Sequence, residues 1–203
     1  LIKHLDLLYL GISDINYIEE YSFPVNFNIH TSKGHAKRLI AEHSLLQALA
    51  LIRKFPQAIH NQGKRRWNQS DFFTGDIRSI RDYKIGILGV GNNGKAIAEI
   101  FKKIGCWVQG YSKNHKEDLN IDRWYLSEEL NDFLNQSEII IVALPLRKET
   151  YQLINKKRIE SMGKNTFIIN IARGEIIDED ALYKALKSNR IRGAALDVFV
   201  KEP

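Results

Sequence analysis

Three glycines and two asparagines have the spacing of a phosphate-binding loop. The stretch GVGNNG, from Gly89 to Gly94, reads G-x-G-x-x-G and stands between an expected strand and an expected helix. In such a loop Gly89 makes the turn, Gly91 lets a pyrophosphate approach the backbone, and Gly94 lets the helix pack on the strand. The amides of Asn92 and Asn93 would face the anion at the start of the helix. The alternative is a glycine-rich turn with a purely structural role.

The next expected strand ends without the acidic residue that often accompanies such a loop. A carboxylate about 20 residues beyond the glycines bonds the ribose hydroxyls of NAD. Here the strand leads into Ser112, Lys113 and Asn114, while Glu117 and Asp118 follow several residues later. A carboxylate would repel a 2′-phosphate, whereas a serine hydroxyl and a lysine can bind one. We therefore predict a preference for NADP(H), with NAD(H) possible through a substitute donor or a non-discriminating polar loop.

A doubly wound α/β sheet is expected to position these loops. From residue 84 onward, short runs rich in Ile and Val alternate with helical stretches, which is typical of parallel strands covered on both faces. The expected strands are 84–90, 106–111, 138–144, 166–172 and 193–199. The expected helices are 93–104, 127–135, 152–161 and 179–188. Gly105 and Gly163 are expected to follow two of these helices, and Asp178 is expected to cap the last one.

The segment before residue 84 has a different pattern. Residues 1–30 are short apolar pieces. Residues 36–55 carry apolar side chains at helical spacing, which predicts one long helix that ends before Pro56. Residues 57–82 are polar and irregular, so we expect a surface loop.

Composition argues against several classes of protein. The chain has 203 residues, 44% of them hydrophobic, and no apolar run approaches the roughly 20 residues of a membrane span. The single cysteine, Cys106, excludes an internal disulfide and a multi-cysteine zinc site; no metal site is predicted, and a cytoplasmic location fits. The net charge of +6 and the patch at residues 64–67, KRRW, permit nucleic-acid binding. Acidic residues are interleaved almost throughout, so we expect small phosphate and carboxylate ligands and no nucleic acid.

The last third of the chain carries the most specific motifs. It contains NIARG (170–174), IDEDAL (177–182) and GAALDVFVKEP (193–203). Together these motifs resemble the D-isomer-specific 2-hydroxyacid dehydrogenase family. The segment IIIVALPLRKET (139–150) is similar to that family's strand and loop beside the cofactor. The long helix with the later Trp67 resembles its interdomain helix and following loop, so the resemblance covers about residues 30–203.

The resemblance implies a role for each matching residue. Arg173 would hold the 2-oxo acid, because a guanidinium fork suits a carboxylate with an adjacent carbonyl oxygen. Asp197 would lie near the nicotinamide carboxamide and Arg173. Glu202 would pair with a catalytic histidine and raise its pKa, so that the histidine can donate a proton at neutral pH. Further cofactor contacts are implied, besides Arg173 itself, for Leu144, Pro145, Ile171 and Ala172. Substrate contacts are implied, besides Arg173, for Gly11 and Ile12.

The same resemblance implies the domain organisation. Residues 1–33 would be a remnant of a substrate-binding domain, and residues 34–203 an NAD(P)-binding domain that is incomplete at its C-terminus. The family's catalytic histidine belongs after Glu202, and all six histidines of this chain come before residue 116. We therefore expect a piece of a longer dehydrogenase that binds cofactor but turns over poorly. A homodimer is expected, since family members commonly pair through the cofactor domain.

The function implied is hydride transfer between NAD(P)H and a small 2-oxo acid or D-2-hydroxy acid. Reduction of a glyoxylate-like or hydroxypyruvate-like substrate is expected, because NADPH favours the reductive direction in cells. An NAD-linked enzyme such as phosphoglycerate dehydrogenase is the alternative, although no acid stands at residue 112. Formate dehydrogenase shares the fold, but Glu202 argues against it. A cofactor-sensing corepressor-like binding protein is the non-enzymatic alternative.

Overall fold

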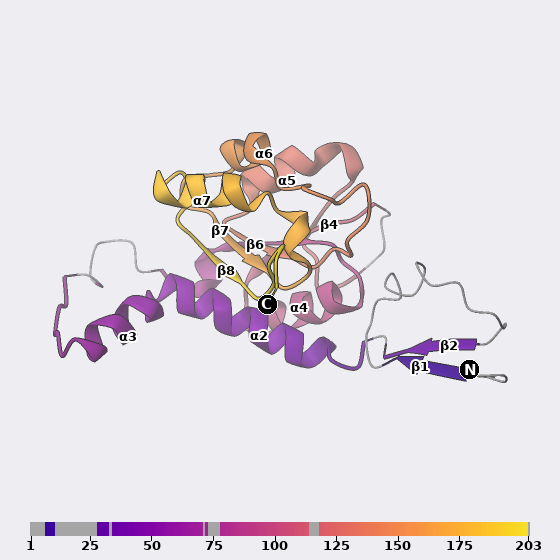
Figure 1. The fold of residues 1–203 in the computed structure, drawn as a ribbon, viewed down its shortest axis with the longest axis horizontal. Helices are drawn as coiled ribbons and strands as arrows, with labels where there is room; N and C mark the ends of the chain where they lie inside the picture. Colours follow the sequence, from indigo (N-terminus) through magenta and orange to yellow (C-terminus); the bar gives the residue numbers. More distant parts are fainter. Residues whose placement is uncertain are drawn as a thin grey trace.

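The core of the protein is a six-stranded parallel sheet (Figure 1). The computed structural model describes residues 7–10, 28–32, 34–70, 72, 78–113 and 118–202. The strand order is β5-β4-β3-β6-β7-β8. The strands are β3 (Lys84–Leu88), β4 (Trp107–Tyr111), β5 (Arg123–Tyr125), β6 (Ile139–Val142), β7 (Phe167–Asn170) and β8 (Gly193–Leu196). The order reverses between β3 and β6, which is the arrangement of a dinucleotide-binding sheet.

Helices cover both faces of the sheet because its central strands are apolar on both sides. In β6, Ile139 and Ile141 belong to one hydrophobic core, while Ile140 and Val142 belong to the other. Helices α2 and α4 contribute to the first core, and α5, α6 and α7 to the second, on opposite sides of the sheet in Figure 1. The helices are α2 (Lys37–Ile52), α3 (Phe55–Gly63), α4 (Asn92–Lys103), α5 (Leu130–Gln136), α6 (Lys156–Ser161) and α7 (Glu179–Lys187). The expected doubly wound α/β fold is confirmed.

The expected surface loop at 57–82 is partly wrong. The long helix ends before Pro56, as expected, although at Ile52 and not at residue 55. Pro56 itself occupies the first turn of α3, where a missing N–H costs nothing. Lys54, with φ +51°, makes the break between α2 and α3. A short 3-10 helix, η1 (Ile80–Asp82), also falls in this segment, and its cap is Ser79. Pro56 therefore starts a second helix after a left-handed residue.

Several other helices and strands differ from the expected ranges, and local sequence features explain the differences. β5 was not predicted: it has only three residues, and one of them, Tyr125, is fully buried. The expected helix 152–161 begins only at α6, where the Asn155 side chain accepts the N–H of Arg158. Two further 3-10 helices of three residues each are η2 (Ser127–Glu129), which precedes α5, and η3 (Gly174–Ile176), which follows β7. The Asp178 cap and the left-handed Gly105 after α4 are both confirmed.

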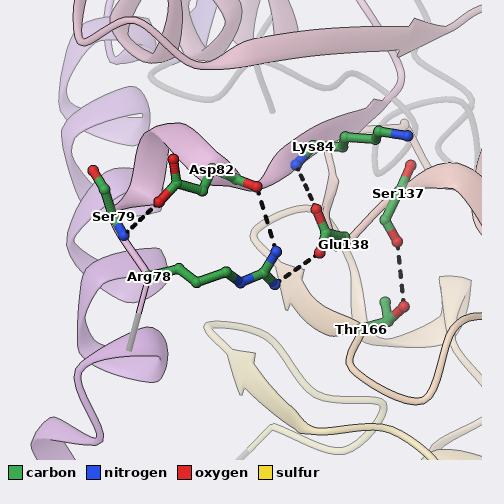
Figure 2. Close-up of polar contacts among 7 residues, drawn as sticks. All are labelled: Arg78, Ser79, Asp82, Lys84, Ser137, Glu138 and Thr166. Atoms are coloured by element: carbon green, nitrogen blue, oxygen red, sulfur yellow. Dashed lines mark hydrogen bonds and ion pairs between the residues drawn. The ribbon is translucent and has the colours of Figure 1, made fainter. Parts of the chain in front are cut away.

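Polar contacts fasten the amino ends of the strands (Figure 2). The Glu138 carboxylate accepts a hydrogen bond from Arg78 at 2.7 Å and one from the backbone N–H of Lys84 at 3.0 Å. Thr166 Oγ1 donates to the Ser137 carbonyl, just before β6. The starts of β3, β6 and β7 are thereby joined at the edge of the sheet away from the phosphate-binding loop, so these contacts are structural.

A separate pair of short parallel strands precedes the main sheet. β1 (Leu7–Leu10) pairs with β2 (Asn28–Thr31), and Figure 1 places the pair beyond the amino end of α2. In the described ranges, the longest helix, α2, has 16 residues, and none is long and apolar enough to cross a membrane.

Candidate functional site

The six strands of the sheet end in register, and the ends of five of them bring the expected site residues to one edge. The final residues of β4, β3, β6, β7 and β8 pair side by side across the sheet. The residues that follow them, in spatial order, are Ser112, Gly89, Ala143, Ile171 and Asp197. Four steps of about 4.8 Å separate the two ends of this row, or roughly 19 Å. The carboxyl edge of a parallel sheet at its switch point is where dinucleotides bind.

The backbone of the row is fixed by hydrogen bonds between neighbouring strands. The N–H of Gly89 donates to the carbonyl of Tyr111 at 3.0 Å, and that of Ala143 to Leu88 at 2.9 Å. The N–H of Asp197 likewise donates to Asn170 at 3.0 Å. Each loop therefore leaves the sheet in a direction set by the strand beside it.

The three glycines meet different surroundings. A Cβ on Gly89, whose φ is +105°, would lie 2.9 Å from the backbone nitrogen of Leu144. A Cβ on Gly94 would overlap the carbonyl oxygen of Gly89. A Cβ on Gly91 would meet no atom within 4 Å, because Gly91 faces open space. Two glycines are thus needed for packing, and the third leaves room for a ligand, which fits a bound pyrophosphate.

The start of α4 is suited to an anion. Gly91 is the N-cap residue, and no side chain caps the first turn, where Asn92 and Asn93 stand. That turn also contains no acidic residue. Free N–H groups and the helix dipole both favour negative charge at such an end.

At the β4 end of the row, Ser112 and Lys113 are available to a ligand. The backbone N–H of Ser112 donates to Tyr125 at 3.2 Å. Within the described residues, no polar contact involves the Ser112 hydroxyl or the Lys113 ammonium. Asn114 and Glu117 lie outside the described residues.

Asp118, the first acidic residue after β4 among those described, is engaged elsewhere. Its Oδ2 lies 3.3 Å from Lys95 Nζ, and its Oδ1 accepts the backbone N–H of Asn120 at 3.0 Å. Burial opposes ionisation, but the hydrogen bonds from Asn120 and Lys95 outweigh it and hold the pKa of Asp118 below its ordinary value. Asp118 therefore fastens the loop after β4 to α4, a contact that the sequence analysis did not predict.

The loop that carries Arg173 is held on both sides. Asn170, at the end of β7, accepts the N–H of Ala172 at 3.1 Å and donates to the carbonyl of Arg173 at 2.9 Å. A Cβ on Gly174 would overlap the backbone of Phe199, so the loops after β7 and β8 lie in direct contact. The half-buried Arg173 side chain donates to the Ala172 carbonyl at 2.7 Å. The guanidinium is therefore anchored at the same edge as the glycine loop.

The remaining expected site residues divide into three groups. Leu144 packs beside Gly89, and the carbonyl of Pro145 accepts the Thr150 hydroxyl, so both lie at the switch point. Glu202 accepts the N–H of Phe199 at 3.0 Å and is exposed. Gly11 and Ile12 lie outside the described residues.

Asp197 contacts a residue that was not assigned to the site. Its Oδ1 lies 3.2 Å from Nε2 of His43, on α2. The sequence analysis gave His43 no functional role. Its place among the residues that recur at helical spacing in the expected helix 36–55 was the one available signal. The site therefore includes a side chain from the helix that crosses the sheet.

Comparison with known proteins agrees with this geometry. A family model described as "D-isomer specific 2-hydroxyacid dehydrogenase, NAD binding domain" matches residues 45–203. A glyoxylate reductase from Pyrococcus horikoshii is 44% identical over 119 residues, which are 59% of this chain and 36% of that protein.

Solved structures resemble the chain closely. A D-isomer specific 2-hydroxyacid dehydrogenase from Xanthobacter autotrophicus Py2, in complex with NADPH and MES, superposes with a TM-score of 0.74 and 34% identity, over 82% of this chain and 67% of that one. A D-lactate dehydrogenase with NAD+ from Lactobacillus jensenii gives a TM-score of 0.75 and 31% identity, over 85% of this chain and 51% of that one. The chain thus spans about a third to two thirds of the length of these relatives.

Proposed function

The chain belongs to the D-isomer-specific 2-hydroxyacid dehydrogenase family. We propose that it is part of a reductase that prefers NADPH and acts on a small 2-oxo acid. Glyoxylate and hydroxypyruvate are the substrate types that we favour, and the corresponding D-2-hydroxy acid is the product. The observation that carries the proposal is the anchored position of Arg173 at the carboxyl edge of the sheet, beside the loop after β8. Residues 34–203 would be the cofactor domain and residues 1–33 part of the substrate domain.

The residues at the carboxyl edge of the sheet would each have a separate role in binding. When bound, the nicotinamide cofactor supplies the hydride. The backbone of Gly91 and the start of α4 would hold the pyrophosphate. Arg173 would orient the substrate through its carboxylate and carbonyl oxygen, which places the carbonyl carbon and lowers the entropy cost of the reaction. Asp197 would accept an N–H of the nicotinamide carboxamide, and Glu202 would stabilise a protonated histidine.

The preference for NADPH rests on the end of β4. Ser112 and Lys113 follow the strand, and neither side chain has a polar partner among the described residues. A hydroxyl and an ammonium can both bind a 2′-phosphate, whereas Asp118 is already paired with Lys95. We also propose a cytoplasmic setting, where a lone buried thiol such as Cys106 stays reduced.

Ser112→Asp is expected to reverse the cofactor preference. The new carboxylate would repel the 2′-phosphate and accept the ribose hydroxyls, so NADPH should bind about 100-fold more weakly while NADH binds as well or better. Lys113→Met should weaken NADPH by about tenfold and leave NADH unchanged. Calorimetric titration of the chain with each nucleotide measures both effects, with Lys157→Met on α6 as the matched control. Tighter binding of NADH than NADPH by the unmodified chain would contradict the proposal.

We further propose a homodimer formed through α2 and α3. Leu39 and Leu46 lie one heptad apart on α2 and are 68% and 60% exposed, on the side away from the buried Ala41 and Ala48. Phe55 and Ile59 extend this apolar strip onto α3. Exposed apolar strips of this kind mark interfaces between proteins, and a second copy of the chain is the partner that we propose.

Leu46→Glu is expected to convert the dimer to a monomer. A carboxylate in the middle of the strip would be desolvated in the dimer without a partner, which opposes association. Light scattering after size-exclusion chromatography gives the mass directly. Leu119→Glu is the matched control, since Leu119 is fully exposed in the loop before β5. A monomeric unmodified chain would disprove the dimer and leave the proposed reaction untouched.

A further inference from the structure

One contact links the long helix α2 to the carboxyl edge of the sheet. His43 stands six residues after the start of α2, and its Nε2 lies 3.2 Å from Oδ1 of Asp197, the first residue after β8. The two residues are 154 positions apart in the chain. The contact therefore depends on the packing of α2 across β7 and β8, where Leu51 also approaches Gly193.

Gln47 stands beside the same histidine nitrogen. Its Nε2 lies 2.9 Å from Nε2 of His43, and its Oε1 is buried without a hydrogen-bond partner in the described part of the chain. A carboxylate only accepts, so His43 must donate to Asp197, and a second donor cannot share that nitrogen. A half-turn of the Gln47 amide places its oxygen beside that nitrogen, and the single Nε2–H of His43 is then shared between Gln47 and Asp197. Gln47, His43 and Asp197 form one chain of polar contacts.

This chain of contacts sets the direction of a carboxylate that would otherwise rotate. The Asp197 side chain is about half exposed, so solvent alone would leave it several orientations. The bond to His43 engages Oδ1, and Oδ2 has no partner among the described residues. A carboxylate with one oxygen engaged presents the other in a fixed direction, which lowers the entropy cost of binding a further donor.

We propose that His43 is a positioning residue for the cofactor: it orients Asp197 so that Oδ2 accepts the N–H of the nicotinamide carboxamide. The inference rests on the proposed binding of a nicotinamide cofactor at this edge. His43 does not touch the cofactor itself. Its contribution is to the recognition of the carboxamide and not to the affinity for the adenosine and phosphate groups, which bind at the other end of the row.

The test compares three ligands that differ at the nicotinamide end. NADPH carries the carboxamide, the reduced acetylpyridine analogue carries a methyl ketone without an N–H, and 2′-phospho-ADP-ribose carries no ring. In calorimetric titrations of the chain, His43→Leu should lower the preference for NADPH over the acetylpyridine analogue by about threefold to tenfold. It should leave 2′-phospho-ADP-ribose binding unchanged. His43→Gln should restore the preference, because an amide can donate to Asp197 from a similar place.

Two more variants keep the test decisive. Asp197→Asn replaces one carboxylate oxygen with an NH2 donor. Its remaining oxygen can still accept from His43, so a donor takes the place of Oδ2 and should abolish the preference. Gln47→Leu should also lower the preference for NADPH over the acetylpyridine analogue, by a smaller factor. This variant keeps the test informative if His43→Leu does not fold. His60→Leu, at an exposed position on α3, is the control and should change nothing.

The outcomes separate this inference from the proposed function. Failure of the unmodified chain to bind any of the three ligands would overturn both. A loss of preference in Asp197→Asn without a loss in His43→Leu would overturn the role of His43 alone. If His43→Leu weakened the binding of all three ligands equally, His43 would have a merely structural role, and the proposed positioning role would also be overturned. The positioning role of His43 is supported if His43→Leu lowers the preference for NADPH over the acetylpyridine analogue, leaves 2′-phospho-ADP-ribose binding unchanged, and is rescued by His43→Gln.

Discussion

Gly91→Ala is expected to weaken cofactor binding strongly without weakening the fold, whereas Gly94→Ala is expected to damage the fold itself. A methyl group on Gly91 meets no protein atom within 4 Å and fills the space left for the pyrophosphate. NADPH should bind about 100-fold more weakly, with the free energy of unfolding unchanged within roughly 0.5 kcal/mol. A methyl group on Gly94 overlaps the carbonyl of Gly89 and should cost about 2–3 kcal/mol of stability.

Urea unfolding and calorimetric titration of both variants separate the two effects. Gly63→Ala is the matched control, since a Cβ at Gly63 also meets nothing within 4 Å and this residue ends α3, far along the chain from the loop. If Gly91→Ala bound NADPH as tightly as the unmodified chain does, the glycine loop would not be the phosphate site.

Arg173→Lys is expected to lower kcat/KM for glyoxylate by about 100- to 1,000-fold in the whole protein. Lysine keeps the charge but loses the planar pair of donors that matches a carboxylate and a neighbouring carbonyl oxygen. The loop should keep its shape, because the contacts from Asn170 involve only the backbone of residues 172 and 173. The dissociation constant of NADPH should therefore change less than about threefold.

Initial rates of NADPH oxidation at several glyoxylate concentrations, together with cofactor titrations, provide the measurement. Arg66→Lys, at an exposed position after α3, is the control for the substitution itself. An equal loss of cofactor affinity and of kcat/KM would place Arg173 in the cofactor site and exclude it from substrate recognition.

Most of the fold could be predicted because its signals are local. Each central strand is a continuous apolar run, so β3, β6 and β7 were found within two residues at each end. β5 was missed because three residues, of which only Tyr125 is buried, are too few to show a strand pattern. α3 was missed because Pro56 was interpreted as a stop, while the left-handed turn at Lys54 depends on packing that the sequence does not reveal.

The candidate site was predictable where a sequence motif combines particular residue types with a fixed spacing. The glycine loop and the Arg173 segment were predicted in this way, and the structure brings both to one edge of the sheet. The partners of Asp118 and Asp197 were not predictable. Lys95 and His43 reach them from separate helices, and no periodicity relates a helix position to a loop far along the chain.

The common end point of strands β4, β3, β6, β7 and β8 has a consequence for how new specificities can arise in this fold. Ser112, Gly89, Ala143, Ile171 and Asp197 each follow a strand of fixed register. An exchange at Ser112 or Asp197 therefore leaves the places of the others unchanged, whereas Gly89 has no room for a side chain. The insertion of one residue inside a strand would instead turn its buried side chains to the opposite face and displace the loop after it. Changes of cofactor or substrate are therefore accessible through single exchanges along this edge, and strand length is the property under the strictest constraint.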